Sequence, residues 1–184
     1  MDIRLHLRSN TWRHAPEILT LTDEFTRQSL AIRVAEAFTS TDVKAVLGEV
    51  IKDRGAPTFL CSDNGSEFIA RDLGIWLAVQ EVSTRNTLPG KPWQNGFAES
   101  FHSRLREECL SPEVFSSAQH ASVLIEGWQA FYNAHRPHSS LAYQTPDEFA
   151  ATWLTLGFTS CTLYLSRVST RSRPNIGASP RRVD

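Results

Sequence analysis

The sequence predicts one layered α/β domain, built from short strands and amphipathic helices and followed by a tail. Three observations support this class. The first third of the chain alternates apolar and polar residues with the period of two that strands show. Helical stripes then alternate with short buried runs, a pattern that favours helices packed on a sheet. The chain has 184 residues, of which 41% are hydrophobic, enough for one sizeable core.

The N-terminal part is expected to supply three strands. In residues 17–25, Leu19 and Leu21 alternate with threonines, and in residues 29–38 the apolar side chains again fall on alternate positions. An earlier strand over residues 2–8 would place its three apolar side chains on one face. These three segments therefore predict one side of a sheet.

The middle of the chain is expected to be mainly helical. Residues 41–54 carry an apolar stripe at helical spacing, with Thr41 as the expected N-cap. Gly55 and Pro57 would end that helix. Further helices are expected over 67–80, 97–110 and 117–134. Short strands are expected over 58–61 and 82–87.

The last part of the chain differs from the rest in composition. Residues 1–155 are expected to form the folded core, and residues 156–184 a flexible Arg- and Ser-rich tail with one short strand at Cys161–Leu165. Residues 1–160 carry 14 Lys and Arg against 19 Asp and Glu. An acidic body disfavours nucleic acid unless some carboxylates hold divalent cations, which invert the local field.

Cysteine spacing and hydropathy exclude several classes of protein. Cys61, Cys109 and Cys161 are far apart and no CxxC pair occurs, so neither a disulfide framework nor a zinc site is expected. No apolar run approaches the roughly 18 residues of a membrane span. The N-terminus lacks the apolar stretch of a secretory signal. A cytoplasmic protein without a membrane partner is expected.

Two carboxylates stand where a strand end and a helix start can converge. Asp63 follows the short buried strand in CSDNGSEF, and Glu99 lies one turn into a helix in QNGFAES, with 35 residues between them. Two carboxylates at one point repel unless a cation lies between them, and Mg²⁺ prefers such oxygen ligands. A turn Asp and a surface Glu explain the same residues without any site. The spacing alone leaves both interpretations open.

The segments around these carboxylates resemble a known family. The resemblance is carried, in order, by DEFTRQSLAI, CSDNGSEF, PGKPWQNGFAESFHSRLREECL and YNAHRPHSSLAYQTPDEF. These segments resemble insertion-sequence DDE transposases of the second-reading-frame type, which have a retroviral-integrase-like catalytic core. The resemblance covers about residues 17–150. It implies a ribonuclease-H-like fold, with a five-stranded mixed sheet flanked by helices.

The resemblance assigns catalysis and metal binding to three carboxylates, Asp2, Asp63 and Glu99, which would hold two Mg²⁺ or Mn²⁺ ions. Asp2 matches the family's first Asp, which lies on the first strand, although no Trp precedes it here. Asp23 is the rival for that role. By register it matches a second-strand Asp outside the triad, and it could instead cap the turn to Thr26.

Other residues of these segments are expected to contact DNA or to support the site. The DNA-binding candidates are Lys91, Gln94, Asn95, Arg106, His135, Arg136 and His138. The supporting candidates are Asn64, Gly65, Gly96 and Ser103. Glu99, Ser103 and Arg106 follow at helical spacing and are expected to share one helix face. For each candidate, an ordinary loop, turn or surface role is the alternative.

The function implied by the resemblance is DNA nicking and strand transfer by a transposase, provided that Asp2 completes the triad. The alternative is a truncated, non-catalytic remnant that keeps the fold and an association with DNA, because no helix-turn-helix is visible ahead of Asp2. A standalone ribonuclease-H-type nuclease would share the carboxylates but not the QNG and RPHSSL motifs. Expected partners are element-end and target DNA, further copies of the chain on that DNA, and an upstream helix-turn-helix reading-frame product. The protein would then be nucleoid-associated.

Overall fold

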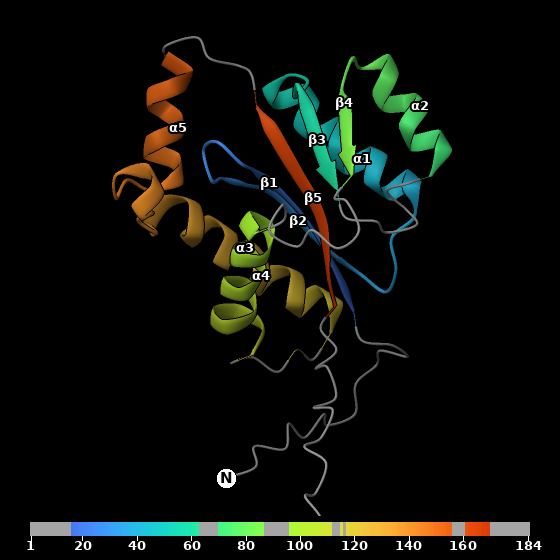
Figure 1. Ribbon diagram of the computed structural model, residues 1–184. Coiled ribbons are helices and arrows are strands. Elements are labelled where there is room, and N and C mark those ends of the chain that lie inside the picture. The colour runs from blue at the N-terminus through green and yellow to red at the C-terminus, as the bar shows by residue number, and fades with distance from the viewer. Residues whose placement is uncertain are drawn as a thin grey trace, which may run out of the picture.

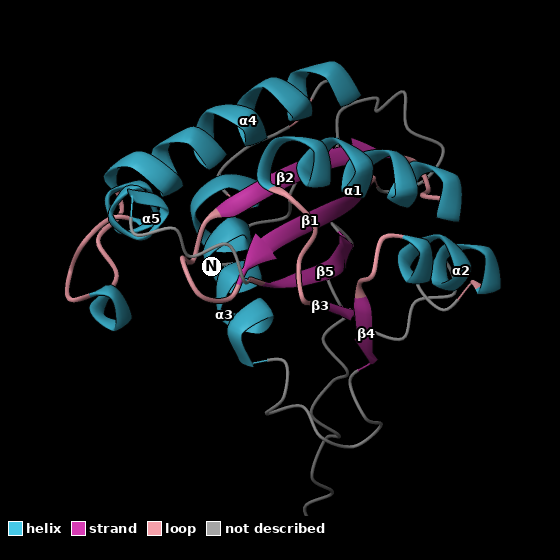
Figure 2. Cartoon of the chain, turned by 90° about the horizontal axis from the view of Figure 1, so that it is seen from above, coloured by secondary structure: helices cyan, strands magenta, loops and turns pink. Residues whose placement is uncertain are grey.

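A mixed five-stranded sheet lies at the centre of the chain, with helices on both of its faces (Figures 1 and 2). The computed structural model describes residues 16–62, 70–86, 96–111, 115, 117–155 and 161–169. The strands are β1 Glu17–Asp23, β2 Ser29–Ala35, β3 Phe59–Ser62, β4 Ser83–Asn86 and β5 Thr162–Ser169. The helices are α1 Ser40–Arg54, α2 Arg71–Val79, α3 Gly96–Leu105, α4 Ala118–His135 and α5 Pro146–Thr155.

The strand order is β2-β1-β5-β3-β4. Strand β1 runs antiparallel to both β2 and β5, whereas β3 runs parallel to both β4 and β5. Antiparallel neighbours follow from the short turn between β1 and β2, and parallel neighbours from the helix α2 that connects β3 with β4. The predicted mixed sheet flanked by helices is therefore confirmed.

Alternation along the strands divides the core into two clusters. On one face, Leu21 and Leu165 pack against α1 and α2, whose buried contributors include Leu47. On the other face, Ile18 and Val168 pack against α3 and α4. Residues 18 and 19 of β1 belong to different clusters, as a period of two requires.

The start of α1 differs by two residues from the prediction. The N-cap is Thr39, not Thr41. The Thr39 hydroxyl accepts from the Asp42 backbone N–H, and the Asp42 carboxylate accepts from the Thr39 N–H at 2.8 Å, so two donors are satisfied reciprocally. Gly55 ends the helix as predicted, with a φ of 86° that favours glycine.

Strand β5 is longer and more central than the short strand predicted at Cys161–Leu165. It lies between β1 and β3, and Leu163, Leu165 and Val168 are each at most 1% exposed. Residues 162–169 are thus part of the core, although composition predicted a tail there. The strand was underestimated because Leu163, Leu165 and Val168 stand among polar residues such as Ser166 and Arg167. Residues 156–160 and 170–184 lie outside the described residues.

Two further segments differ from the predicted helices. The helix expected over 97–110 is α3 followed by a π-helical turn at Arg106–Leu110. Helix α5 was not predicted, although Thr145 and Glu148 form a reciprocal cap at its start, with Thr145 N–H donating to Glu148 at 2.9 Å. Within the described part of the chain, no helix has the length and hydropathy needed to cross a bilayer.

Candidate active site

Helix α3 carries Glu99 in its first turn, and that turn packs over the central strand β5. Phe97, in the first turn of α3, stacks edge-on against Tyr164 of β5 at 5.5 Å. In the sheet, Tyr164 is the direct neighbour of Cys61 on β3. The start of α3 therefore lies over β5, beside the strand that leads into Asp63. The Glu99 side chain, in the same turn as Phe97, is exposed.

A buried histidine fastens α3 to the sheet. The Nε2 atom of His102 lies 3.1 Å from the Thr20 hydroxyl on β1 and 3.0 Å from the Ser166 hydroxyl on β5. Burial lowers the pKa of His102 to about 4, and the charge of Arg106 adds to that shift. The ring is therefore neutral at pH 7, and its hydrogen bonds hold the helix that carries Glu99.

The rival carboxylate, Asp23, is committed to the turn between β1 and β2. It is 6% exposed, its Oδ1 accepts from the Phe25 N–H at 3.1 Å, and its Oδ2 accepts from the Thr26 hydroxyl at 2.6 Å. The predicted alternative, that Asp23 caps the turn to Thr26, is confirmed. The turn ends on Arg27, which donates its N–H to the Asp23 carbonyl and has a φ of 64°. That conformation costs a non-glycine residue about 1 kcal/mol.

Three arginines converge on a hollow of about 300 Å³ beside α3. Arg27 comes from the β1–β2 turn, Arg104 from α3, and Arg136 from the end of α4. Arg136 is paired with Glu108. His138 also lines the hollow, and its Nε2 atom is buried without a hydrogen-bond partner among the described residues. Burial first, and then the charges of these three arginines, lower the pKa of His138 to about 4.

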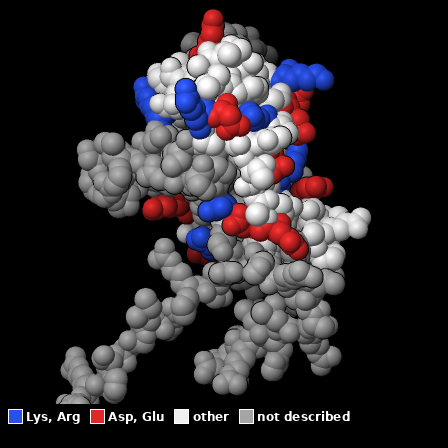
Figure 3. Space-filling view, turned by 90° about the vertical axis from the view of Figure 1, so that its right-hand side faces the viewer, with Lys and Arg blue, Asp and Glu red and all other residues white. Residues whose placement is uncertain are grey.

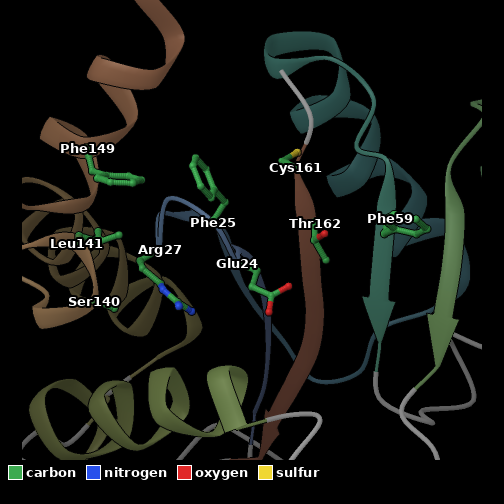
Figure 4. Close-up of a pocket in the computed structure, with 9 residues that line it drawn as sticks. All are labelled: Glu24, Phe25, Arg27, Phe59, Ser140, Leu141, Phe149, Cys161 and Thr162. Atoms are coloured by element: carbon green, nitrogen blue, oxygen red, sulfur yellow. The ribbon is translucent and has the colours of Figure 1, made fainter. Parts of the chain in front are cut away.

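A second hollow, of about 520 Å³, adjoins the first (Figure 4). Arg27 and Ser140 line both hollows, and in the close-up the Arg27 side chain extends from the β1–β2 turn toward α3. Its guanidinium lies over the Phe97 ring, 4.6 Å from the centroid. Glu24 contributes one carboxylate to this second hollow. The two hollows therefore share Arg27 and Ser140 in their walls, and Phe97 of α3 lines the first hollow.

Charge is distributed differently on the side of the molecule that carries α2 and β4. There, basic and acidic side chains are interspersed (Figure 3). Lys44 of α1 pairs with Asp72 of α2 at 2.8 Å. The concentration of arginines around the first hollow is therefore a local feature and not a property of the whole surface.

The structure places only part of the predicted site. Ser103 and Arg106 are exposed, like Glu99, and Gly96 is the first residue of α3. Arg136 and His138 line the first hollow, whereas His135 is exposed and packs against Phe131. The predicted residues outside the described part of the chain are Asp2, Asp63, Asn64, Gly65, Lys91, Gln94 and Asn95.

Three residues of this region were not predicted from the sequence. Arg27, Arg104 and His102 acquire their roles from partners far away in the chain; His102 contacts residues 82 and 64 positions distant. Local patterns carry no signal for such contacts. The one available clue was that Arg27 belongs to DEFTRQSLAI, one of the segments that resemble the transposase family.

The donors expected to hold metal are all carboxylates, which suit a hard cation such as Mg²⁺ or Mn²⁺. Glu99 fits that role because its side chain is exposed in the first turn of α3. Within the described ranges, no three His, Cys, Asp or Glu side chains lie close enough together to hold an ion.

Sequence comparisons relate the chain to insertion elements. Two family models of the integrase core domain match residues 1–92 and 80–146. An insertion element IS407 protein of Burkholderia multivorans is 38% identical over 133 residues, which cover 72% of this chain and 48% of that protein. An insertion element IS136 protein of Agrobacterium fabrum is 32% identical, with 69% of each chain covered. The chain spans about half the length of the first of these relatives.

Solved structures share the fold. The catalytic core domain of BIV integrase superposes with a TM-score of 0.60 and 17% identity, covering 77% of this chain and 91% of that one. The catalytic core domain of HTLV-2 integrase, solved in complex with magnesium, gives a TM-score of 0.55 at 14% identity, covering 71% and 82%. At these identities the likeness establishes the integrase-core, ribonuclease-H-like fold.

Proposed function

This chain belongs to the integrase core domain family of insertion-element transposases, and we propose that it is the catalytic domain of a DNA transposase. The observation that carries the proposal is the position of Glu99. It is exposed in the first turn of α3, and that turn packs over β5 beside the end of β3. Strand β3 ends at Ser62, and Asp63 is the next residue in the chain. Of the two carboxylates predicted to act together, one therefore follows β3 directly and the other lies on the helix that packs over the neighbouring strand β5.

Strand alternation supports the pairing of Asp63 with Glu99. On β3, Leu60 belongs to the cluster under α1 and α2, whereas Cys61 is beside Tyr164, which α3 covers. Continued alternation would bring Asp63, two residues after Cys61, to the α3 side of the sheet. We propose that Asp63 and Glu99, with Asp2 as the third carboxylate, hold two divalent cations.

The proposed chemistry is phosphoryl transfer at DNA. In nicking, a water oxygen forms a bond to phosphorus as the bond to a 3′-oxygen breaks, which leaves a 3′-hydroxyl. In strand transfer, that hydroxyl attacks a target phosphodiester as another 3′-oxygen departs. One P–O bond replaces another, so no nucleotide cofactor is needed. Bound Mg²⁺ or Mn²⁺ would supply Lewis-acid stabilisation of the charge that develops on the phosphate oxygens.

The chain's own residues would orient the DNA. His102 holds α3 against β1 and β5 and so positions Glu99. Arg106 is exposed at the start of the π-helical turn that follows α3, and Arg136 and His138 line the first hollow. We assign these three, with His135, to the DNA backbone. The same role is proposed for Lys91, Gln94 and Asn95, and a supporting role for Asn64, Gly65, Gly96 and Ser103.

The wider context is also part of the proposal. The chain spans 48% of the IS407 protein, and the activity and partners of a whole transposase are proposed for it here. We propose element-end and target DNA as substrates, assembly of several copies on that DNA, a helix-turn-helix reading-frame product as partner, and a place at the nucleoid.

One observation favours a second candidate, a non-catalytic remnant that keeps the fold. Both neighbours of β3 in the sheet, β4 and β5, lack Asp and Glu. Neither strand beside the end of β3 can therefore complete the set of carboxylates. The assignment of activity rests on Asp2.

A strand-transfer assay with pre-cut DNA ends and Mg²⁺ separates the two candidates. The active domain should join the pre-cut 3′ ends to target DNA, and Asp2→Asn, Asp63→Asn and Glu99→Gln should each lower the rate at least a hundredfold. Asp53→Asn, an exposed change at the end of α1, is the matched control and should retain the wild-type rate. Full activity of Asp2→Asn would remove Asp2 from the triad, and no joining by the wild-type chain would favour the remnant.

A further inference from the structure

The hollow lined by Arg27, Arg104 and Arg136 is cationic, and its charge is unbalanced. Of the three arginines, Arg136 is paired with Glu108. Arg27 and Arg104 form no ion pair within the described ranges, and the Arg27 Nε atom is buried without a hydrogen-bond partner there. Like charges gathered in a partly buried hollow repel one another. Such an arrangement is stabilised when an anion enters.

His138 points to the same ligand. Its Nε2 atom is buried and lacks a partner among the described residues, although a neutral ring can donate or accept there. The ring is fixed by edge-on packing against Tyr132 of α4, at 5.2 Å. A fixed polar atom in a cationic hollow is available to a group that carries several acceptor oxygens.

The backbone at Arg27 adds an independent observation. Its φ of 64° is one that L side chains rarely adopt, and the capped turn from Asp23 to Thr26 imposes it. That conformation directs the guanidinium over Phe97 and into the hollow. Strained conformations of this kind concentrate at ligand sites, where the surrounding structure holds them.

We propose that this hollow binds a backbone phosphate of DNA through Arg27, Arg104 and His138. The inference rests on the proposed DNA-processing function and adds a contact point to it. The described residues supply planar guanidinium donors, which suit phosphate oxygens, and a hollow of about 300 Å³ that can admit one phosphodiester.

The phosphate site is separate from Glu99. Phe97, Ser100 and Arg104 of α3 line the hollow, and Glu99 does not. Helical geometry places Glu99 and Arg104 about 140° apart around the helix axis and about 7.5 Å apart along it. The hollow therefore holds a different phosphate from the one at the carboxylates. A single DNA strand that passes α3 can place one phosphate in the hollow and another at Glu99. The contact in the hollow would then fix which phosphodiester lies at the carboxylates.

DNA affinity measured against salt concentration tests this contact. Arg104→Gln lies on an exposed helical position, and Arg27→Asn keeps a side chain that tolerates positive φ. Each should lower the affinity for a short duplex about tenfold at low salt, and each should reduce the slope of log K against log salt by about one. Arg33→Gln is the matched control, because Arg33 pairs with Glu49 of α1 on the other face of the sheet.

A second measurement uses pyrophosphate as the probe and needs no DNA. Arg27, Arg104 and Arg136 face His138 together with Tyr132, and an anion among them would favour ring protonation. At pH 5.5, adding pyrophosphate should shift the ring nitrogen signals of His138 toward the protonated form, and Arg104→Gln should weaken the shift.

The outcomes distinguish the phosphate site from the wider function. Variants at Arg27 and Arg104 that match Arg33→Gln in affinity and salt slope would overturn the site while leaving the proposed DNA function intact. A pyrophosphate response without any DNA binding would leave an anion site in the hollow but would overturn both its assignment to a DNA phosphate and the proposed DNA function. A wild-type chain that responds to neither probe would overturn the site.

Discussion

The two faces of the sheet are built for different tasks. The face under α1 and α2 is lined by leucines, including Leu21, Leu60 and Leu165, each at most 2% exposed. The face under α3 and α4 also has an apolar cluster, but Thr20, His102 and Ser166 form a buried polar contact within it. Beside that contact lie the arginine-lined hollow and Glu99. The first face stabilises the fold by apolar packing. On the second face, polar groups that position a site replace part of that packing.

The largest expected effect is on the leucine face, at the central strand. Leu165→Ala removes a fully buried side chain of β5 and should lower the free energy of unfolding by about 3–5 kcal/mol. Urea unfolding followed by tryptophan fluorescence measures the change. Val79→Ala, at a 73% exposed position of α2, is the control and should stay within about 0.5 kcal/mol of wild type. A small effect of Leu165→Ala would contradict the central position of β5.

The next largest effect is a pH dependence of stability that comes from His102, on the face under α3 and α4. The pKa of His102 is lowered to about 4 in the folded chain, against 6.5 for a free histidine, so below pH 6.5 the unfolded chain binds a proton that the folded chain does not. Stability should therefore be complete above pH 6.5 and fall by about 3 kcal/mol as the pH drops to 4.

His102→Gln isolates this contribution, because glutamine does not titrate in that range. Urea midpoints measured from pH 7 to pH 5 should decline less steeply for His102→Gln than for the wild-type chain. His138, whose pKa is also lowered to about 4, is present in both proteins and cancels in the difference. Parallel declines would mean that folding does not lower the pKa of His102.

The smallest effect concerns how a helix on the leucine face begins. Thr39→Ala removes the hydroxyl that caps α1 and should cost about 1 kcal/mol of stability. Thr41→Ala, at an exposed position inside the helix, should cost less. The thermal midpoints of the two variants give the comparison. A larger loss for Thr41→Ala would restore the N-cap first predicted from the sequence.

The leucine face was the more predictable of the two. The regular spacing of apolar residues predicted its strands and helices, and Gly55 marked the end of α1 in the sequence. The error there was in the residue at which α1 begins, which is Thr39 and not Thr41, because each of several threonines and serines in a row can cap a helix. The exception was β5, whose apolar residues are too few to distinguish a central strand from a tail by composition.

The functional face was predictable only where the family resemblance reached. Glu99 and the HRPH motif were singled out from those segments, and Glu99 does lie in the first turn of α3, which packs over β5. The hollow itself was not predictable, because Arg27, Arg104 and His138 lie on three separate segments and meet only after folding. The role of Asp23 could not be predicted from the sequence either, since both the catalytic and the turn-cap interpretations fitted its sequence context.

Mg²⁺ titration of the thermal midpoint tests the central claim most directly, because an ion that binds the native site stabilises the fold. Mg²⁺ should raise the midpoint of the wild-type chain, and Glu99→Gln and Asp63→Asn should each abolish the rise. Glu126→Gln, an exposed change on α4, should retain it. An equal rise in Glu99→Gln, Asp63→Asn and Glu126→Gln would place the metal elsewhere and contradict the assignment of Asp63 and Glu99 as its ligands.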